Sequence, residues 1–255
     1  MINYESITKV HLEISTRCNA SCPLCPRNLA GYETDLGYPI HDMSLNEAKG
    51  IFTQEFLLQL KHILINGNFG DFVTAKDGTS ILEYFFYTNP AIKIDISTNG
   101  SAKPNIWSDL ARFKNLTIGF DLDGLADTHS IYRRNTDWNL IIKNANNFIR
   151  AGGNATWRMI VFEHNKHQIA DCKELSKKMG FKNFQIINDG RDNGPVYDKQ
   201  GKFSYSFGKK TIDYPDDVLT WKSWTSYNQQ NQIWPIEPIS KNKNCHTKKI
   251  GRAHV

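Results

Sequence analysis

The sequence contains no long hydrophobic run. None of its apolar stretches approaches the roughly 18 to 20 residues that a membrane-spanning helix needs. Residues 1–5 lack the basic and apolar segments with which a secretory signal peptide begins. These absences exclude a helical membrane protein and a protein exported by such a signal, so we expect a cytoplasmic location.

Cysteine is scarce, and strong charge of one sign is missing. The chain has five cysteines in 255 residues, an odd number with three of them in one short loop, which excludes a disulfide framework. The formal net charge is only +5, and nothing resembles the interleaved basic and aromatic residues of a nucleic-acid-binding surface. A hydrophobic fraction of 40% and a charged fraction of 22% are typical of a globular protein.

The three clustered cysteines are the most informative feature. Cys18, Cys22 and Cys25 have the spacing C-x3-C-x2-C and follow an apolar run at residues 10–14. Three thiolates can hold an iron–sulfur cluster, and because a four-iron cluster normally takes four protein ligands, one iron would stay open. Zinc is an alternative, although structural zinc sites take four ligands. Ordinary buried cysteines are a second alternative.

Strand-like and helix-like segments alternate along the first three quarters of the chain. This alternation predicts an α/β fold with a parallel sheet. The six expected strands are residues 10–15, 62–66, 92–97, 116–121, 155–161 and 183–188.

Three expected helices have recognisable ends. Ser44 and Glu47 form a capping box that opens a helix over residues 48–60. Gly152 is expected to end a helix over residues 138–151, and Gly180 one over residues 167–179.

Polar residues and glycines follow the expected strands. Parallel strands bring their carboxyl ends to one edge, where active sites of barrel proteins gather. The segments at residues 66–71, 97–100 and 121–124 are also compatible with plain turns, and both interpretations stay open. Arg158 lies inside an expected buried strand, so its charge needs a partner.

Residues 13–19 and 22–27 closely resemble the cluster loop of the radical S-adenosylmethionine enzymes. The resemblance implies that Cys18, Cys22 and Cys25 hold three irons of a 4Fe-4S cluster and that S-adenosylmethionine chelates the fourth. It also implies a partial (β/α)6 TIM-like barrel over residues 1–190.

The resemblance further implies a set of cofactor-binding residues. Leu24 stands where the family places a residue near the adenine, and residues 66–71 match a glycine-rich motif that binds the methionyl amino group. Arg158 is expected at the cofactor carboxylate, with an internal Asp or Glu as the structural alternative. The full expected set is Leu24, Gly67, Asn68, Asp71, Asn99, Asp121 and Arg158.

The segment beyond residue 190 differs in character. Residues 191–249 are rich in turn-forming, polar and aromatic residues, and we expect an irregular extension. Residues 243–249, which include Cys245, resemble the opening of the auxiliary-cluster region called SPASM, whose remainder is then missing. Residues 250–255 can be back-translated into a common sequencing-adapter sequence, so we expect a non-native tail.

The function implied by the resemblance is reductive cleavage of S-adenosylmethionine to a 5′-deoxyadenosyl radical that abstracts hydrogen from a substrate. The SPASM-like segment favours a peptide or protein side chain, with a small metabolite or nucleoside as the alternative. The resemblance also implies an external electron donor of the flavodoxin or ferredoxin type. A noncatalytic iron–sulfur or electron-transfer protein is the alternative from another class.

Overall fold

The computed structural model describes residues 3–25, 27–31, 33–34, 39–102, 105–187 and 194–207, together with two short strands at 219–220 and 253–254. Cys245 and the rest of the SPASM-like segment lie outside the described residues. Among the described residues, no helix is both long enough and apolar enough to cross a membrane.

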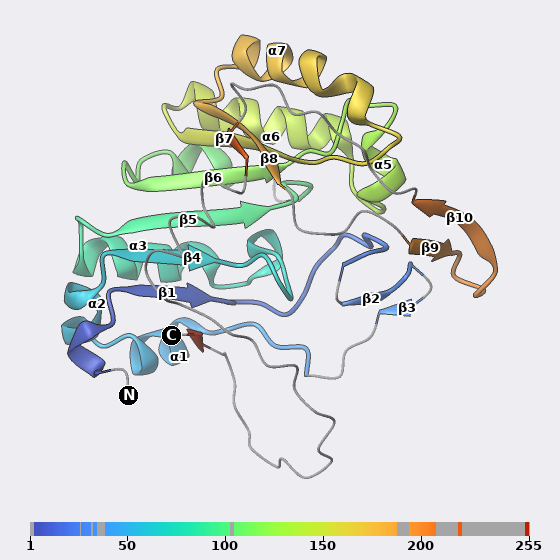
Figure 1. Cartoon of the computed structure of the whole chain (residues 1–255). Helices are drawn as coiled ribbons and strands as arrows, with labels where there is room; N and C mark the ends of the chain where they lie inside the picture. Colours follow the sequence, from blue (N-terminus) through green and yellow to red (C-terminus); the bar gives the residue numbers. More distant parts are fainter. Residues whose placement is uncertain are drawn as a thin grey trace.

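A sheet of six parallel strands forms the centre of the molecule (Figure 1). The strands pair in the order of the chain, each with the next, as the sequence predicted for a run of β/α units. They are β1 (Lys9–Leu12), β4 (His62–Ile65), β5 (Lys93–Thr98), β6 (Leu116–Asp121), β7 (Asn154–Ile160) and β8 (Asn183–Ile187). The short strands β11 (Leu219–Thr220) and β12 (Ala253–His254) extend the sheet beside β8 and β1.

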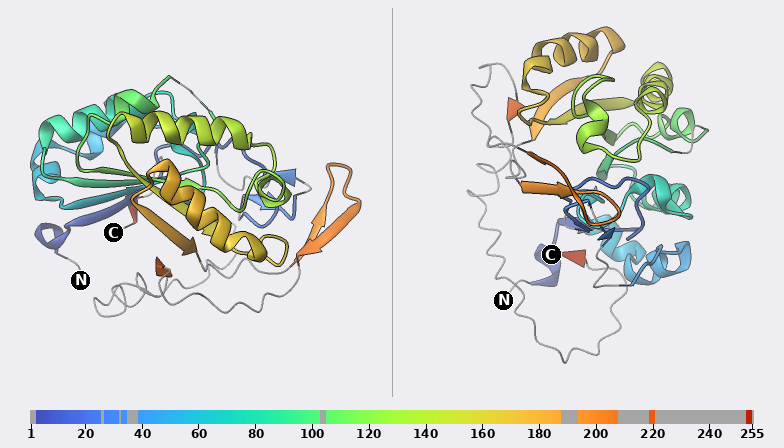
Figure 2. Two further views of the ribbon diagram at one scale, coloured as in Figure 1. Left: turned by 90° about the horizontal axis from the view of Figure 1, so that it is seen from above. Right: turned by 90° about the vertical axis from the view of Figure 1, so that its right-hand side faces the viewer.

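The helices lie along the outer face of the curved sheet (Figure 2). Trp107, Phe120 and Phe148 show how the layers pack: all three are fully buried, and they come from a helix, a strand and a second helix. The α-helices are α1 (Leu45–Ile51), α2 (Gln54–Gln59), α3 (Gly78–Thr88), α4 (Trp107–Leu110), α5 (His129–Tyr132), α6 (Trp138–Arg150) and α7 (Ile169–Met179). Short 3-10 helices are η1 (Tyr4–Ser6), η2 (Phe72–Thr74) and η3 (Lys166–Gln168).

The helix expected over residues 48–60 is two helices, which corrects the prediction. The capping box of Ser44 and Glu47 is present and opens α1. Thr53 then interrupts the helix, because its hydroxyl accepts a hydrogen bond from the amide of Phe56 at 3.2 Å and so starts α2. The break lets Phe52 point into the core, where its ring centroid lies 5.0 Å from that of Phe85.

Glycines end the helices α6 and α7 as expected. Gly180 has φ +87°, and its amide donates to the carbonyls of Ser176 and Lys177. Gly152 follows α6 with φ +90°. Both values lie in the left-handed region, which glycine adopts without the cost that a Cβ atom would impose.

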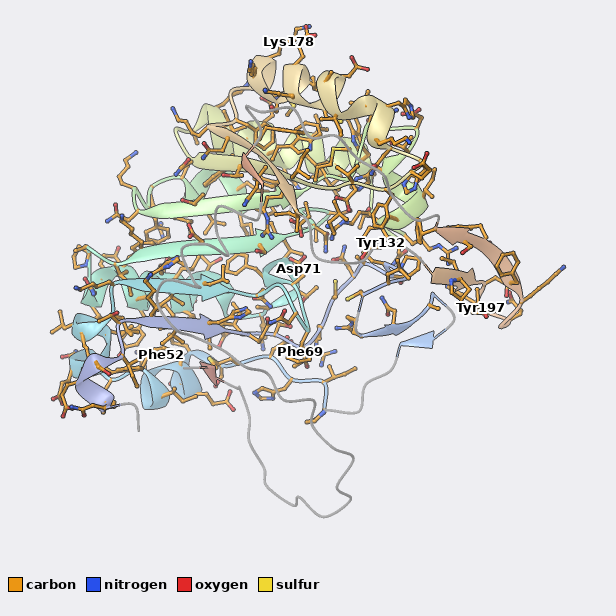
Figure 3. The ribbon with its side chains drawn as sticks, in the orientation of Figure 1. Phe52, Phe69, Asp71, Tyr132, Lys178 and Tyr197 are labelled. Carbon is orange, nitrogen blue, oxygen red and sulfur yellow. The ribbon has the colours of Figure 1, made fainter. Side chains whose placement is uncertain are left out.

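Two hairpins lie at the carboxyl edge of the sheet. The first is β2 (Asn28–Leu29) with β3 (Glu33–Thr34), and the second is β9 (Gly194–Tyr197) with β10 (Phe203–Phe207). The second hairpin is a regular element within the stretch that the sequence predicted to be irregular. Figure 3 shows Tyr197 far out on this hairpin and Tyr132 closer to the sheet. A small apolar cluster joins it to the barrel: Ala20, Cys22, Tyr132, Ile160, Phe162, Ile187, Val196 and Phe207.

Candidate functional site: a cysteine-lined pocket at the carboxyl edge of the sheet

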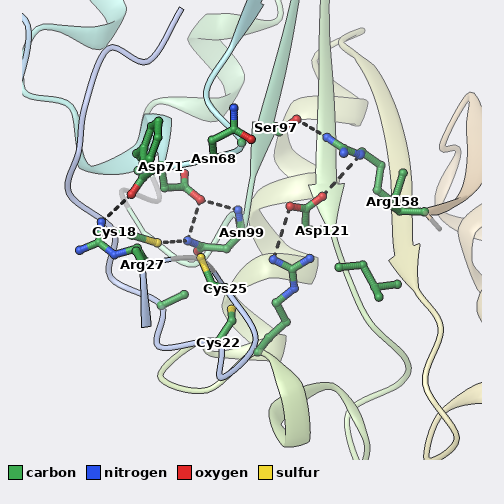
Figure 4. A pocket seen from close by; sticks show the side chains of 17 residues that line it. Cys18, Cys22, Cys25, Arg27, Asn68, Asp71, Ser97, Asn99, Asp121 and Arg158 are labelled. Atoms are coloured by element: carbon green, nitrogen blue, oxygen red, sulfur yellow. Dashed lines mark hydrogen bonds and ion pairs between the residues drawn. The ribbon is translucent and has the colours of Figure 1, made fainter. Parts of the chain in front are cut away.

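One pocket gathers almost all the residues that the sequence singled out (Figure 4). It lies where the parallel strands end, as expected for a barrel protein. Its lining includes all three loop cysteines and six of the predicted cofactor-binding residues: Cys18, Cys22, Cys25, Gly67, Asn68, Asp71, Asn99, Asp121 and Arg158. Leu24 is absent from this lining; it packs against the small apolar cluster, close to Gly194.

Local hydrogen bonds fold the cysteine loop into consecutive turns. The amide of Cys25 donates to the carbonyl of Cys22 at 3.1 Å, and the amide of Asn28 donates to the carbonyl of Cys25 at 2.8 Å. The Asn28 side chain also donates to the carbonyl of Cys22 at 2.9 Å. These contacts within the loop shape its turns, and a hydrogen bond from the Ser21 amide to the carbonyl of Arg134 at 2.9 Å ties the loop to the rest of the chain.

The donor set fits an iron–sulfur cluster. Within the described ranges, no three His, Cys, Asp or Glu side chains are arranged to hold a single metal ion. A cluster does not need such convergence, because each cysteine binds a different iron atom. Burial, then the nearby Asp71 and Cys22, raise the pKa of the Cys18 thiol well above its usual range. A thiolate there therefore needs a positive partner, which bound iron would supply.

Arg27 ties the cysteine loop to the glycine-rich loop after β4. Its side chain is buried, and Nη1 donates to the carbonyl of Thr16 at 2.5 Å and to the carbonyl of Phe69 at 2.6 Å. It also lines the pocket. The sequence does not predict these contacts of Arg27, because both acceptors are backbone carbonyls and no side-chain pattern marks them.

The glycine-rich loop is held in a tightly constrained path. Asn66 and Gly67 have φ values of +61° and +127°. At Gly70, an added Cβ atom would lie 1.9 Å from the carbonyl oxygen of Ser15, so the loop crosses the segment that follows β1 in direct backbone contact. Only glycine fits this crossing.

Asp71 points inward and is bound by its protein neighbours. One carboxylate oxygen accepts from the Asn99 amide and from Asn99 Nδ2, both at 2.7 Å. The other accepts from Thr98 Oγ1 at 2.6 Å and from the Val73 amide at 3.1 Å. Burial raises the pKa of Asp71 to about 6, although these hydrogen bonds oppose the shift. The carboxylate thus holds the end of β5 in place, and its contact with a cofactor stays a prediction.

Asn99 links Asp71 to the cysteine loop. Its Nδ2 lies 2.9 Å from Asn19 Oδ1 and 3.7 Å from Cys18 Sγ. A donor at this distance from sulfur is a weak hydrogen bond, and hydrogen bonds to cysteine sulfur influence the electronic properties of a cluster.

Arg158 finds an internal carboxylate partner. Its Nε lies 3.5 Å from Asp121 Oδ1, and Nη1 donates to Ser97 Oγ. The internal partner expected as the alternative is therefore present, while a cofactor carboxylate at this guanidinium stays a prediction. Gly119 provides the space, because a Cβ atom there would lie 2.4 Å from Arg158 Cδ.

A second arginine completes this wall of the pocket. Arg133 Nη1 lies 3.5 Å from Asp121 Oδ2, so Asp121 sits between two guanidinium groups. Arg133 Nε also donates to the fully buried Asp123 at 2.5 Å, and the amide of Ile160 donates to the other Asp123 oxygen at 2.6 Å. Burial raises the pKa of Asp123, and the charge of Arg133 opposes that shift.

His129 contacts the backbone of Asp123 as a neutral side chain. It is fully buried, and its Nδ1 accepts a hydrogen bond from the Asp123 amide at 3.2 Å. The proton of the neutral ring therefore sits on Nε2, which lies 3.1 Å from Thr136 Oγ1. Burial, with Arg133 nearby, lowers the pKa of His129 to about 3.

Comparisons with known proteins give structural likeness alone. No protein-family model and no curated protein match the chain. Streptococcus suis SuiB bound to S-adenosylmethionine matches with a TM-score of 0.58 and 17% identity, over 88% of this chain and 47% of SuiB. Native anSMEcpe with bound AdoMet and Cp18Cys peptide matches with a TM-score of 0.56 and 16% identity, over 88% and 58%. Methylornithine synthase PylB matches with a TM-score of 0.52 and 8% identity, over 71% and 52%.

The chain shares the fold of these three solved structures. The predicted α/β partial barrel is thereby confirmed. In this fold, the cysteine loop follows β1 and opens onto the carboxyl edge of the sheet. The chain spans about half the length of these solved structures, and the identities are low. The likeness therefore shows the fold and not the activity or the substrate.

Proposed function

We propose that the protein is a radical S-adenosylmethionine enzyme in which Cys18, Cys22 and Cys25 hold a 4Fe-4S cluster. The observation that carries this proposal is that the three cysteines share one pocket with the glycine-rich loop and Arg158. When bound, the cluster supplies one electron that splits S-adenosylmethionine into methionine and a 5′-deoxyadenosyl radical, which takes a hydrogen atom from the substrate.

The chain's own residues orient the cofactor in this proposal. Gly67 and Asn68 receive the methionyl amino group, and Arg158 receives the carboxylate. Asp71, Asn99 and Asp121 line the same pocket and complete the cofactor-binding set. Leu24 approaches the adenine. The chemistry supports the assignment, because a guanidinium matches a carboxylate and a polypeptide loop offers carbonyl oxygens to an ammonium group.

We further propose a peptide or protein side chain as substrate and a flavodoxin or ferredoxin as electron donor, in the cytoplasm. The substrate proposal is supported by two structural neighbours whose structures contain peptides: SuiB bound to the precursor peptide SuiA, and anSMEcpe with the Cp18Cys peptide.

The test is anaerobic reconstitution with iron and sulfide, followed by reduction with dithionite, addition of S-adenosylmethionine and measurement of 5′-deoxyadenosine. Cys22→Ala removes one proposed ligand. Cys172→Ala is the matched control, because Cys172 is a buried cysteine in α7 that lies outside the pocket. We expect 5′-deoxyadenosine from the wild type and from Cys172→Ala, and none from Cys22→Ala.

Either of two results would overturn the proposal. A reduced cluster that never cleaves S-adenosylmethionine would favour the noncatalytic alternative. Cleavage that survives the loss of Cys22 would remove the cysteine loop from the mechanism.

A further inference from the structure

Glu13 lies buried beneath the glycine-rich loop, directly after β1. Its side chain accepts three consecutive backbone amides: Oε1 accepts from Asn68 at 2.9 Å, and Oε2 accepts from Phe69 at 3.3 Å and from Gly70 at 3.4 Å. Successive N–H groups that converge in this way form a concave anion site. Here the anion is a carboxylate of the chain itself.

Two further side chains fix the position of this carboxylate. Asn66 Nδ2 donates to Glu13 Oε2 at 3.2 Å, and His11 Nε2 lies 3.2 Å from Oε1. Glu13 is only 7% exposed, so its charge depends on these protein donors and not on water. These contacts therefore fix the position of the Glu13 carboxylate relative to the glycine-rich loop.

The contacts also fix the direction of the loop carbonyls. The described chain contains no cis peptide bond, and in a trans peptide the carbonyl points opposite to the amide. The amides of Asn68, Phe69 and Gly70 belong to the same peptide units as the carbonyls of Gly67, Asn68 and Phe69. These carbonyls consequently point away from Glu13, and Arg27 already binds that of Phe69. The carbonyls of Gly67 and Asn68, two residues that line the pocket, are the remaining acceptors.

We propose that Glu13 is the positioning residue that makes the glycine-rich loop a site for an ammonium group. Because Glu13 holds the amides of Asn68, Phe69 and Gly70 on its own side, the opposite side of the loop presents carbonyl oxygens, which accept hydrogen bonds from a cation and repel an anion. The inference rests on the proposed function, because the ammonium group is that of S-adenosylmethionine. Glu13 acts through the peptide planes and does not touch the cofactor.

The test compares two ligands in two variants. The ligands are S-adenosylmethionine and its des-amino analogue, in which hydrogen replaces the ammonium group, and binding to the reconstituted, oxidised protein is measured by calorimetry. In Glu13→Gln, one acceptor oxygen becomes an NH2 donor that opposes a loop amide. We expect the preference of the wild type for S-adenosylmethionine over the analogue to fall about ten-fold, with the affinity for the analogue unchanged. Glu47→Gln, which alters the carboxylate of the capping box outside the pocket lining, keeps the preference.

The outcomes separate this inference from the proposed function. Glu13→Gln with an unchanged preference would overturn the inference alone. A wild-type protein that binds neither ligand would refute the proposed function, and the inference with it. If Glu13→Gln does not fold, hydrogen exchange of the wild type decides: the amides of residues 68–70 should be protected before any cofactor is added, and rapid exchange would refute the role of Glu13.

Discussion

At the scale of single residues, Asn99 connects a buried carboxylate to a proposed cluster ligand. Its amide nitrogen contacts both Asp71 and Cys18 Sγ. A hydrogen bond to a cluster sulfur stabilises the reduced state, which carries more negative charge. We expect Asn99→Ala to lower the midpoint potential of the reconstituted cluster by tens of millivolts, on the order of what one such hydrogen bond contributes.

Potentiometric titration followed by electron paramagnetic resonance measures this change. Asn144→Ala is the control, because Asn144 is a buried amide that donates to the carbonyls of Gly100 and Ala102 and is not a pocket residue. An Asn99→Ala potential equal to that of the control would show that the contact with Cys18 does not reach the cluster.

Arg158 is the residue whose loss should weaken cofactor binding most directly. Its guanidinium is shared between Asp121 and Ser97, and it lines the pocket. We expect Arg158→Gln to weaken binding of S-adenosylmethionine about ten-fold or more, because a charge-assisted contact with the carboxylate is lost. Equilibrium dialysis with the reconstituted protein measures it. Arg150→Gln, at the exposed end of α6, should bind as the wild type does, and equal affinities for both variants would exclude Arg158 from the site.

At the scale of elements, two glycines should respond to the same substitution in opposite ways. Gly70→Ala places a Cβ atom 1.9 Å from the Ser15 carbonyl oxygen, so the segment after β1 and the glycine-rich loop must separate. Gly50 lies inside α1, and a Cβ atom there meets nothing within 4 Å. We expect Gly70→Ala to lower the free energy of unfolding by more than about 2 kcal/mol, and Gly50→Ala to raise it by about 0.5–1 kcal/mol.

Urea unfolding followed by circular dichroism measures both changes. The pair forms its own control, since the same methyl group is added in each variant. Two variants of equal stability would mean that the crossing at Gly70 relaxes without cost.

The elements also show where sequence reasoning succeeds and where it fails. The six strands were predictable because their apolar residues are continuous or alternate, and burial follows that pattern in β4 and β7. The break at Thr53 was not predictable, because a capping box indicates where a helix begins and not where the helix ends. The Thr53 cap is accompanied by burial of Phe52 against Phe85 in α3, a contact that only the folded chain reveals.

The site also contains residues that the sequence singles out and residues that it does not. A short motif or a charge in a buried strand singles out the cysteines, Gly67, Asn68 and Arg158, and the structure brings them to one pocket. Their roles there stay predictions. Glu13, Arg27 and Asp123 were given no role, although each is buried and paired. Each has at least one partner that lies 37 to 57 residues away in the chain, so only the folded chain reveals that contact.

At the scale of the whole molecule, the barrel carries a buried histidine whose charge state couples folding to pH. An exposed histidine side chain has a pKa near 6.5. Burial lowers the pKa of His129 to about 3 in the folded protein. Between these values the unfolded chain binds the extra proton and the folded chain does not. The contribution of His129 to stability is therefore complete above about pH 6.5 and is lost progressively as the pH falls toward 3.

Replacement of His129 by Asn should remove this dependence while leaving one side-chain acceptor for the Asp123 amide. We expect the wild type to lose stability relative to His129→Asn by up to about 1.4 kcal/mol for each pH unit below 6, which is the free energy of one proton bound by the unfolded state alone. Urea unfolding of the iron-free protein at pH 7, 6, 5 and 4.5 gives the two curves. Asp71 has a raised pKa and acts in the opposite direction in both proteins, so it cancels in the difference. Curves that stay parallel would mean that the folded protein takes up a proton at His129, which its hydrogen bond from Asp123 and its burial both oppose.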